Sequence, residues 1–340
     1  MPKARTLFFI APKQVEIREV TLPALKENEV LVEVNCSAIS AGTEMLVYRG
    51  QFPRLTDVHD NLSSDLKYPL AYGYACVGKV VNAGKSVQGE WQNKAVFGFQ
   101  PHTSHFIPTT ESLLPIPLLL KPETASFLPS METAVNLVQD GAPLLGERVL
   151  VLGQGIIGLL SASLLLEFPL AALITADHFE LRRAALDVEG AVAGAHTSLD
   201  SSRANFRKQA AAVFKSGSDL TLELSGSPAA LNDAIALTAF SGRVVIGSWY
   251  GEKRAEIDLG GGFHRSRIKL ISSQVSTISA ELSTRWNKAR RFEIAWEALK
   301  RIKPEKWITH RFPLDQAGHA YQLLDENPQE AIQVLLEYPS

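Results

Sequence analysis

The stretch VLVLGQGIIGLL, Val149 to Leu160, limits the fold of this chain more than any other feature of its sequence. Apolar residues typical of a buried strand precede Gly153, and a second apolar run begins after Gly155. With Gly158, these glycines have the spacing GxGxxG, which is informative only between a strand and a helix. Gly153 would permit the tight turn, and Gly158 would let the helix pack closely on the strand. The stretch therefore predicts a strand, a turn and a helix in direct succession.

Strand-like and helix-like segments alternate around this turn. From Lys121 onward, apolar strands such as ALITAD and DLTLELSG are separated by helix-like segments such as ELRRAALDVEGA and PAALNDAIALTAF. Strands that are apolar along their whole length are typical of a parallel sheet with helices on both faces. We therefore predict an α/β fold whose residues 126–277 form a doubly wound parallel sheet of the Rossmann type.

The sequence pattern differs at the two ends of the chain. Up to about Ile116 the sequence reads as short strands separated by turns, and Val30, Val32 and Val34 alternate with more polar positions. Residues 52–68 are polar and read as a long loop, of the kind that often has a function. Apolar residues recur at helical spacing from Leu282 to Leu299, and a strand ends the chain. We therefore expect a second domain, rich in β-structure, from residues 1–125 and 278–340.

The glycine turn indicates a dinucleotide site. Gly155 would let the backbone approach a pyrophosphate, which would lie at the N-terminus of the following helix. Asp177 ends the next strand, where a carboxylate accepts hydrogen bonds from ribose hydroxyls and repels a 2′-phosphate. We therefore expect NAD(H) as the preferred cofactor, and NADP(H) remains possible because Arg182 and Arg183 lie nearby. The alternative is that Asp177 only caps the helix that follows it.

Composition excludes several other classes of protein. The chain has 340 residues with 34 basic and 36 acidic side chains, and this balance argues against nucleic acid as a partner. Its longest apolar run, residues 155–166, is shorter than the roughly 20 residues that span a membrane. The short apolar start, interrupted by Pro12 and Lys13, does not resemble a signal peptide, so we expect a cytoplasmic protein that does not associate with membranes. Two cysteines, Cys36 and Cys76, cannot form a four-cysteine zinc lobe.

The chain resembles the medium-chain dehydrogenase/reductase superfamily over essentially its whole length. The motifs that carry this resemblance are VLVEVNCSAISAGTE, YPLAYGYACVGKVVNAG, META, LGQGIIG and LELSG. The resemblance implies a GroES-like catalytic domain beside the Rossmann domain, and an assembly of two or four copies. It also implies further cofactor contacts, which are Ile156, Ile157, Thr133, Ser225 and Gly247.

The zinc-dependent members of that superfamily hold a catalytic zinc ion through three ligand positions. Carried onto this sequence, these positions are Ala41, Tyr74 and Pro129, and none of them offers the usual zinc ligand. His102 and His105 read as ordinary core or surface histidines. The resemblance is therefore to a zinc-less member. The run Ser37 to Glu44 is similar to the bacteriochlorophyllide a dehydrogenase-like branch, although Ala75 departs from that branch.

The stretch AGTEMLVYRG, Ala41 to Gly50, reads as a polar turn and supplies candidate catalytic residues. Thr43 matches the hydroxyl that relays the substrate proton in the zinc enzymes, and Tyr74 could donate a second hydrogen bond to the same oxygen. Glu44 is either a proton acceptor or a structural carboxylate, bonded to backbone N–H groups or to an arginine such as Arg49.

Two further sets of charged residues have alternative interpretations. Glu132 is a weaker candidate for the same role as Glu44. Arg285, Arg290 and Arg291 are either an exposed helix face or an anchor for an anionic substrate, and we prefer the first interpretation.

These observations predict an NAD(H)-dependent oxidoreductase that interconverts a secondary alcohol and a carbonyl in a small-molecule substrate without catalytic zinc. One alternative is a reductase of quinones or enones. Another is a catalytically silent protein that only binds a dinucleotide.

Overall fold

The computed structural model describes residues 1–52 and 66–338, so most of the expected 52–68 loop lies outside the described residues. The chain divides into two units, Met1–Pro129 with Lys303–Ser340, and Ser130–Ile302. The second unit extends to Ile302, beyond residue 277 where we expected it to end, because helix α9 (Lys288–Ile302) contacts helix α5 (Ile156–Leu166).

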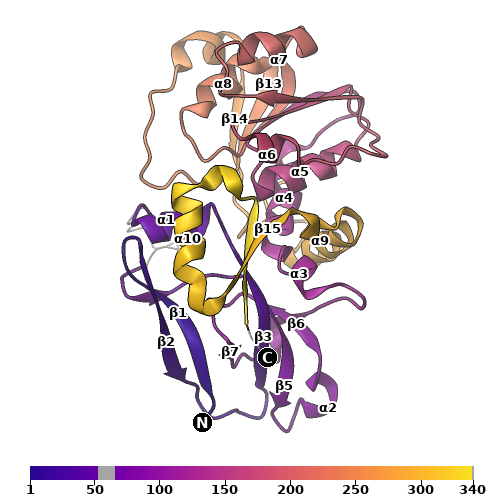
Figure 1. Ribbon diagram of the computed structural model, residues 1–340. Helices are drawn as coiled ribbons and strands as arrows, with labels where there is room; N and C mark the ends of the chain where they lie inside the picture. Colours follow the sequence, from indigo (N-terminus) through magenta and orange to yellow (C-terminus); the bar gives the residue numbers. More distant parts are fainter. Residues whose placement is uncertain (53–65, 339–340) are drawn as a thin grey trace. The chain divides into compact units, whose positions relative to one another are not determined.

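The first unit is rich in β-structure, as predicted, and its strands are antiparallel except for the parallel pair β15 and β16. Two of its sheets have the strand orders β2-β1-β4 and β15-β16-β3-β5-β6-β8, and β7 pairs with β3 outside the second path. The last two strands of the chain therefore complete a sheet that the N-terminal strands begin (Figure 1). The strands are β1 (Lys3–Ala11), β2 (Gln14–Thr21), β3 (Val30–Ile39), β4 (Leu70–Ala71), β5 (Cys76–Ala83), β6 (Ala95–Gly98), β7 (His105–Phe106), β8 (Leu113–Pro115), β15 (Ile308–Pro313) and β16 (Gln333–Glu337).

Short helices join the strands of the first unit. Alternate side chains of β3 (Val30, Val32 and Val34) are buried in a core that also receives Leu46 of α1 and Tyr321 of α10. The α-helices are α1 (Thr43–Arg49), α2 (Gln88–Trp91), α3 (Pro122–Ala125) and α10 (Ala317–Glu326), and the 3₁₀ turns are Thr110–Ser112, Pro304–Trp307, Leu314–Gln316 and Pro328–Glu330.

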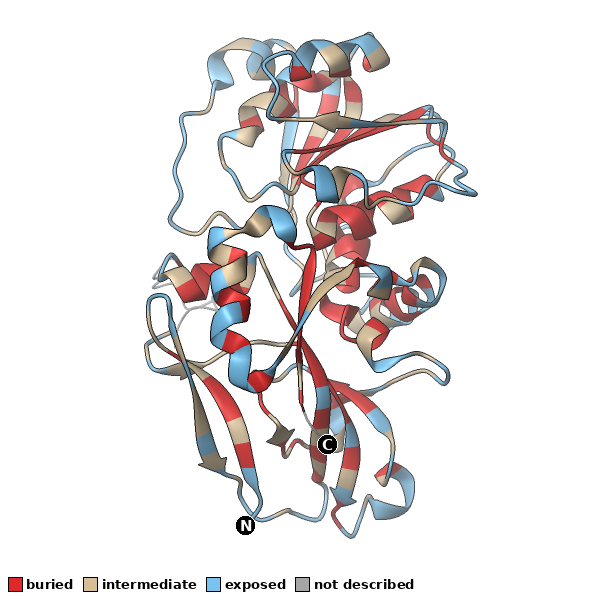
Figure 2. Cartoon of the chain, viewed as in Figure 1, coloured by how far each residue is buried: buried red, intermediate tan, exposed pale blue. Residues whose placement is uncertain are grey.

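The second unit is a doubly wound parallel sheet, as predicted. Its strand order is β11-β10-β9-β12-β13-β14, and all of its pairs are parallel. The central strands β9 and β10 are buried almost throughout (Figure 2). The strands are β9 (Arg148–Leu152), β10 (Ala172–Asp177), β11 (Ala195–Asp200), β12 (Ser218–Glu223), β13 (Thr238–Ile246) and β14 (Lys269–Ser272).

Helices cover both faces of this sheet. Side chains of α7 and α8 pack on one face of β9, β10 and β13, while α5 contacts β9 and β10. The helices are α4 (Leu128–Gly141), α5, α6 (Glu180–Arg183), α7 (Phe206–Phe214), α8 (Ala230–Leu237), a π-helical segment (Leu259–Phe263) and α9. The expected helix over residues 180–191 was too long, since α6 ends at Arg183, and the expected helix from Leu282 begins at Lys288.

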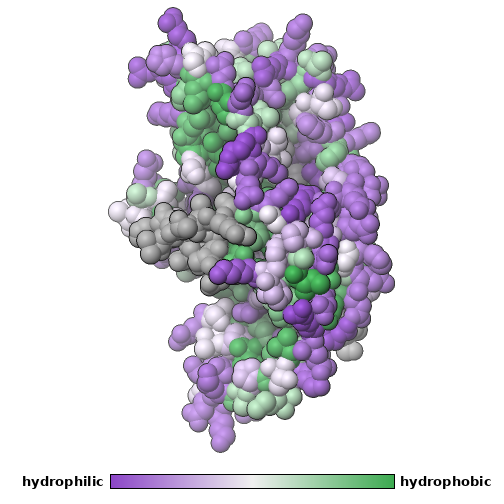
Figure 3. All heavy atoms as spheres, turned by 90° about the vertical axis from the view of Figure 1, so that its left-hand side faces the viewer, coloured by the Kyte–Doolittle hydropathy of each residue, from purple (hydrophilic) through white to green (hydrophobic). Residues whose placement is uncertain are grey.

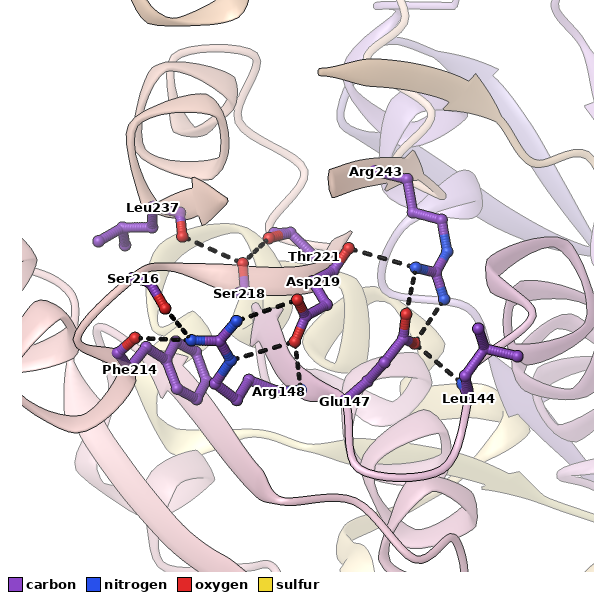
Figure 4. A network of polar contacts seen from close by, with 10 residues as sticks. All are labelled: Leu144, Glu147, Arg148, Phe214, Ser216, Ser218, Asp219, Thr221, Leu237 and Arg243. Carbon is purple, nitrogen blue, oxygen red and sulfur yellow. Dashed lines mark hydrogen bonds and ion pairs between the residues drawn. The ribbon is translucent and has the colours of Figure 1, made fainter. Parts of the chain in front are cut away.

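Two pairs of oppositely charged side chains connect the central strands at the amino edge of the sheet. Arg148, the first residue of β9, makes two side-chain hydrogen bonds to Asp219 of β12, of 3.1 and 3.0 Å (Figure 4). Arg243 of β13 donates to both oxygens of Glu147, at 2.8 and 2.7 Å. Despite partial burial, the hydrogen bonds from Arg148 hold the pKa of Asp219 below its usual value. These paired charges lie at the edge of the sheet opposite to the glycine turn, so they hold the strands together without occupying that turn.

Polar side chains cover most of the face seen in Figure 3, interrupted by hydrophobic patches, which is usual for a protein surface. Within residues 1–52 and 66–338, no helix combines the length and apolar character needed to span a membrane.

Candidate active site

The stretch Ala41 to Gly50 is a short helix, so our expectation of a polar turn was wrong. Helix α1 begins at Thr43 and ends before Gly50, whose backbone is left-handed with φ 69°. The residues from Glu44 to Tyr48 are buried, because Met45, Leu46 and Val47 pack into the core of the first unit. The polar residues that suggested a turn therefore lie in the first and last turns of a helix that is anchored by its apolar side chains.

Glu44 is a carboxylate with no exposed surface, and its oxygens are bonded within the first unit. One oxygen accepts a hydrogen bond from the Ser40 backbone N–H at 3.0 Å. The other lies 2.9 Å from His102 Nε2 and accepts a hydrogen bond from the Tyr321 hydroxyl at 2.6 Å. A buried carboxylate is costly unless it is bonded in this way. The contacts support the structural interpretation of Glu44 over that of a proton acceptor.

The partner of Glu44 is a histidine and not Arg49, which we had named as a possible partner. Arg49 donates to Asp325 at 2.6 Å, and Lys13 pairs with the same carboxylate at 2.7 Å. The two cations hold the pKa of Asp325 below its usual value, although burial opposes them. Arg49 therefore ties α1 to α10 on a different side of the helix.

The hydrogen-bond chain continues from His102 toward the C-terminal strand. His102 Nδ1 lies 2.6 Å from the Ser37 hydroxyl, which lies 2.7 Å from the Tyr338 hydroxyl. If Nε2 carries the proton that Glu44 accepts, Nδ1 of a neutral imidazole accepts from Ser37, and Ser37 accepts from Tyr338. Every donor then has an acceptor. Burial raises the pKa of Tyr338 and Tyr321 well above the usual value, so both phenols remain donors.

Tyr74 lies close to two hydroxyl side chains and to the charge of Glu44. Burial, and then the charge of Glu44, raise the pKa of Tyr74 to about 12, although the nearby hydroxyls of Ser40 and Thr43 oppose the shift. The structure thus brings together Thr43, Tyr74 and Glu44. The result is a cluster of hydroxyl side chains beside a buried carboxylate.

Three positions of this unit were expected to correspond to zinc ligands. Within the described ranges, no group of three or more His, Cys, Asp or Glu side chains is arranged to hold a metal ion. Ala41 and Pro129 have no side-chain donor atom, and a tyrosine is not a usual zinc ligand. The donor set therefore does not fit a zinc ion bound in the usual way.

In the second unit, the glycine turn leaves room at the N-terminus of α5. Gly153 has φ +97°, and a Cβ added there would lie 2.5 Å from the Leu224 carbonyl oxygen. A Cβ on Gly158 would lie 1.9 Å from the Gly153 carbonyl oxygen, whereas one on Gly155 would meet nothing within 4 Å. The buried Gln154 side chain leaves its carbonyl oxygen without a partner. Open space and unsatisfied helix N–H groups fit a diphosphate group.

Asp177 is bound to this turn by its own carboxylate. One oxygen accepts from the Gln154 N–H at 2.7 Å, and the other accepts from the Phe179 N–H at 2.8 Å. A carboxylate has about four acceptor positions, so it retains capacity for a ligand's hydroxyl groups. Arg182 stacks on the Phe179 ring, with its guanidinium carbon 4.8 Å from the ring centre. Both interpretations of Asp177, as a cap and as a ligand for ribose, agree with this geometry.

The other predicted cofactor contacts lie on elements of the second unit. Ile156 and Ile157 begin α5, and Thr133 lies on α4. Ser225 follows β12 and donates its backbone N–H to Glu223 at 2.9 Å. Gly247 follows β13, where a Cβ would lie 2.5 Å from a Leu137 methyl carbon. Ser225 and Gly247 thus lie at the same carboxyl edge of the sheet as the glycine turn.

The basic segment from Arg285 to Arg291, which includes the start of α9, is less exposed than we expected. Arg291 retains 1% of its side-chain surface, and it donates to the carbonyl oxygens of Val275 and Thr277 at 2.9 Å each. Lys288 pairs with Glu132, so Glu132 has a structural partner within the second unit. The expectation of an exposed helix face was wrong for Arg291. Arg290 does conform to it, since it is exposed and its guanidinium carbon lies 4.0 Å from the centre of the Trp286 ring.

The sequence did not reveal the residues that hold Glu44. His102 and Tyr321 lie 58 and 277 positions away along the chain, and Ser37 and Tyr338 are 301 positions apart. We had treated His102 as an ordinary core or surface histidine, and it is indeed in the core. Only one local signal was available. Gly73 has φ +121°, and a Cβ there would lie 2.7 Å from the His102 ring, so the glycine makes room for the imidazole.

We predict that Glu44→Gln destabilises the protein by about 2 kcal/mol or more, because an amide cannot accept from Ser40, His102 and Tyr321 as two carboxylate oxygens do. Denaturant unfolding measures this change. Glu33→Gln is the matched control, since the Glu33 side chain is 40% exposed, and it should change stability by less than about 0.5 kcal/mol. Equal stability of the two variants would refute the network's structural role.

Comparison with known proteins gives matches along the whole chain, although no protein-family model matches it. Over 93% of its length the chain is 22% identical to 94% of an L-threonine 3-dehydrogenase from Xanthomonas campestris pv. campestris. It also matches the crystal structure of 2R,3R-butanediol dehydrogenase from Bacillus subtilis with a TM-score of 0.79 and 19% identity, covering 99% of this chain and all of that one.

Two further structures were determined with a cofactor. A short chain alcohol dehydrogenase from E. coli CFT073 complexed with NADH matches with a TM-score of 0.77 and 21% identity, covering 98% of this chain and 99% of that one. A putative zinc-binding dehydrogenase from Sinorhizobium meliloti 1021 bound to NADP matches with a TM-score of 0.76 and 18% identity, covering 99% and 100%. Together with the glycine turn at the carboxyl edge of a parallel sheet, these likenesses show that the chain shares the fold of these dehydrogenases.

Proposed function

We propose that this protein is an NAD(H)-dependent oxidoreductase that interconverts a secondary alcohol and a carbonyl without catalytic zinc. The observation that carries this proposal is the cluster of the Tyr74, Thr43 and Ser40 hydroxyls beside the buried carboxylate of Glu44. The named relatives add support, because threonine and butanediol both carry secondary hydroxyl groups.

The cluster can stabilise charge on a substrate oxygen. When a carbonyl is reduced, negative charge develops on its oxygen, and preorganised hydrogen-bond donors lower the energy of that state. Tyr74 remains a donor over a wide pH range because its pKa is raised to about 12. The nearby hydroxyls of Thr43 and Ser40 complete the donor set. In the opposite direction, the same donors would stabilise the charge on the alcohol oxygen as its proton passes to solvent.

The second unit supplies the residues that would hold the cofactor. A bound nicotinamide provides the chemistry of hydride transfer. The N–H groups at the start of α5 would bind the diphosphate, and Asp177 would accept hydrogen bonds from a ribose. The negative charge of Asp177 disfavours the additional phosphate of NADP(H), so we propose that NAD(H) is preferred. Thr133, Ser225 and Gly247 lie on elements that would line the nicotinamide half.

Independence from zinc is part of the proposal. Its support is the chemistry of the donor set, since Ala41 and Pro129 offer no side-chain metal-binding atom and Tyr74 stands where an ordinary zinc ligand would be expected. The same departures agree with the resemblance to a zinc-less branch of the superfamily.

Substitution of the two hydroxyl donors tests the reaction. Tyr74→Phe and Thr43→Val should each lower kcat for carbonyl reduction by about 100-fold, because each removes one preorganised donor. The ratio of wild-type to Tyr74→Phe activity should be constant from neutral pH to 10.0 and fall only as pH approaches about 12, where Tyr74 ionises. Tyr68→Phe controls for the loss of a partly buried phenol elsewhere in the unit. Activity on enones but not on carbonyls would favour the reductase alternative.

Removal of metal ions tests the second part of the proposal. After dialysis against a strong chelator, the protein should retain its full turnover with NADH and a carbonyl substrate. Elemental analysis of the purified protein should find less than stoichiometric zinc. A loss of activity that added zinc restores would show that a metal ion takes part, and the proposal for the hydroxyl cluster would then be wrong.

Two glycine substitutions separate folding from cofactor binding. Gly155→Val places a side chain in open space, so it should leave thermal stability nearly unchanged while weakening NADH binding by at least about 10-fold. Gly158→Ala places a Cβ against the Gly153 carbonyl oxygen, so it should lower stability itself. Calorimetry and NADH titration measure the two effects. Normal NADH affinity in Gly155→Val would contradict the assignment of the diphosphate site.

A further inference from the structure

A partly exposed aromatic side chain lies at the carboxyl edge of the parallel sheet, on a segment that hydrogen bonds hold in place. Trp249 follows β13 and retains 36% of its surface exposed. The residues on both sides of it are tied to the end of β12. The Ser248 hydroxyl accepts from the Gly226 N–H at 2.9 Å, and the Tyr250 hydroxyl donates to the buried carboxylate of Glu223.

Further bonds hold the same segment in place. Gly247 donates its N–H to the Glu223 carbonyl oxygen at 3.0 Å, and the Lys253 ammonium donates to the Gly226 carbonyl oxygen at 2.8 Å. Burial, and then the charge of Glu223, raise the pKa of Tyr250, so its phenol remains a donor. A single exposed aromatic residue is unremarkable on a protein surface. One that is presented by a segment bonded on both sides is preorganised to contact a ligand.

The order of the strands indicates which half of a dinucleotide this aromatic residue would meet. The glycine turn follows β9, and Asp177 follows β10 on one side of it. Strands β12 and β13 lie on the other side, so the start of the Trp249 segment is two strand spacings, or about 10 Å, from the turn. A dinucleotide lies across this switch point with its diphosphate at the turn. If Asp177 binds the ribose of the adenosine half, the nicotinamide half extends over β12 and β13.

We propose that the Trp249 indole is the apolar surface against which the nicotinamide half of the cofactor packs. This inference rests on the proposed use of a nicotinamide dinucleotide. An indole offers a large, rigid face, and flat rings gain attraction beyond the burial of area when they stack or meet edge to face. Trp249 would thus fix the nicotinamide ring from the second unit, in addition to the contacts at the diphosphate.

Comparison of NADH with ADP-ribose tests this proposal, because ADP-ribose has both phosphates and the adenosine half but no nicotinamide. Trp249→Ala should weaken the affinity for NADH by about 5- to 10-fold and leave that for ADP-ribose within about 2-fold. Trp249→Phe, which retains an aromatic face, should recover most of the NADH affinity. Isothermal titration or fluorescence anisotropy provides both constants without any turnover.

Phe240 offers a matched control on the same strand. It lies near the amino end of β13 and is 69% exposed, so Phe240→Ala removes an exposed aromatic side chain away from the proposed contact. It should change neither affinity. Unchanged NADH affinity in Trp249→Ala, or an equal loss for both ligands, overturns the inference while leaving the proposed cofactor intact. A wild-type protein that binds neither ligand removes the proposed cofactor, and the inference falls with it.

Discussion

The close contact between Gly158 and Gly153 is the constraint on which the second unit depends. The helix α5 begins directly after a turn whose carbonyl oxygen would lie 1.9 Å from any Cβ at position 158. Because that Cβ is absent, the helix can approach the end of β9, and its N-terminus lies at the carboxyl edge of the sheet. The paired charges of Arg148 and Arg243 lie at the opposite edge and hold the same strands. The charge pairs that hold the strands together and the proposed cofactor site therefore lie at opposite edges of one sheet.

The first unit contains a fully buried carboxylate, that of Glu44. Glu44 has three hydrogen-bond donors, from a backbone amide, an imidazole and a phenol. Removal of any one donor would leave the charge less compensated. Burial, and then the charge of the same carboxylate, raise the pKa of Tyr74, which therefore remains neutral at pH values where an exposed tyrosine would begin to ionise. This effect agrees with the structural interpretation of Glu44.

The sequence predicted those features that depend on local pattern. The glycine turn, the buried strand before it and Asp177 at the end of the next strand all lie within 30 consecutive residues, from 148 to 177. Helix α1 was missed because its polar residues suggested a turn, although Met45, Leu46 and Val47 are buried. The two side-chain partners of Glu44, His102 and Tyr321, could not be found, since they lie on distant segments that meet Glu44 only in the folded unit. Arg291 was misjudged for the same reason, because its acceptors are carbonyl oxygens of a preceding loop.

The first unit is completed by the last part of the chain, and this order matters during synthesis. Tyr321 and Tyr338, which engage Glu44 and Ser37, leave the ribosome after the whole of Ser130–Ile302. Until then the N-terminal strands lack β16, the neighbour of β3, and the carboxylate lacks its phenol donor. The inserted unit can reach its native state first, because its sheet needs no residue beyond Ser272. The N-terminal strands of the first unit therefore obtain their full set of neighbours only after the inserted unit has been synthesised.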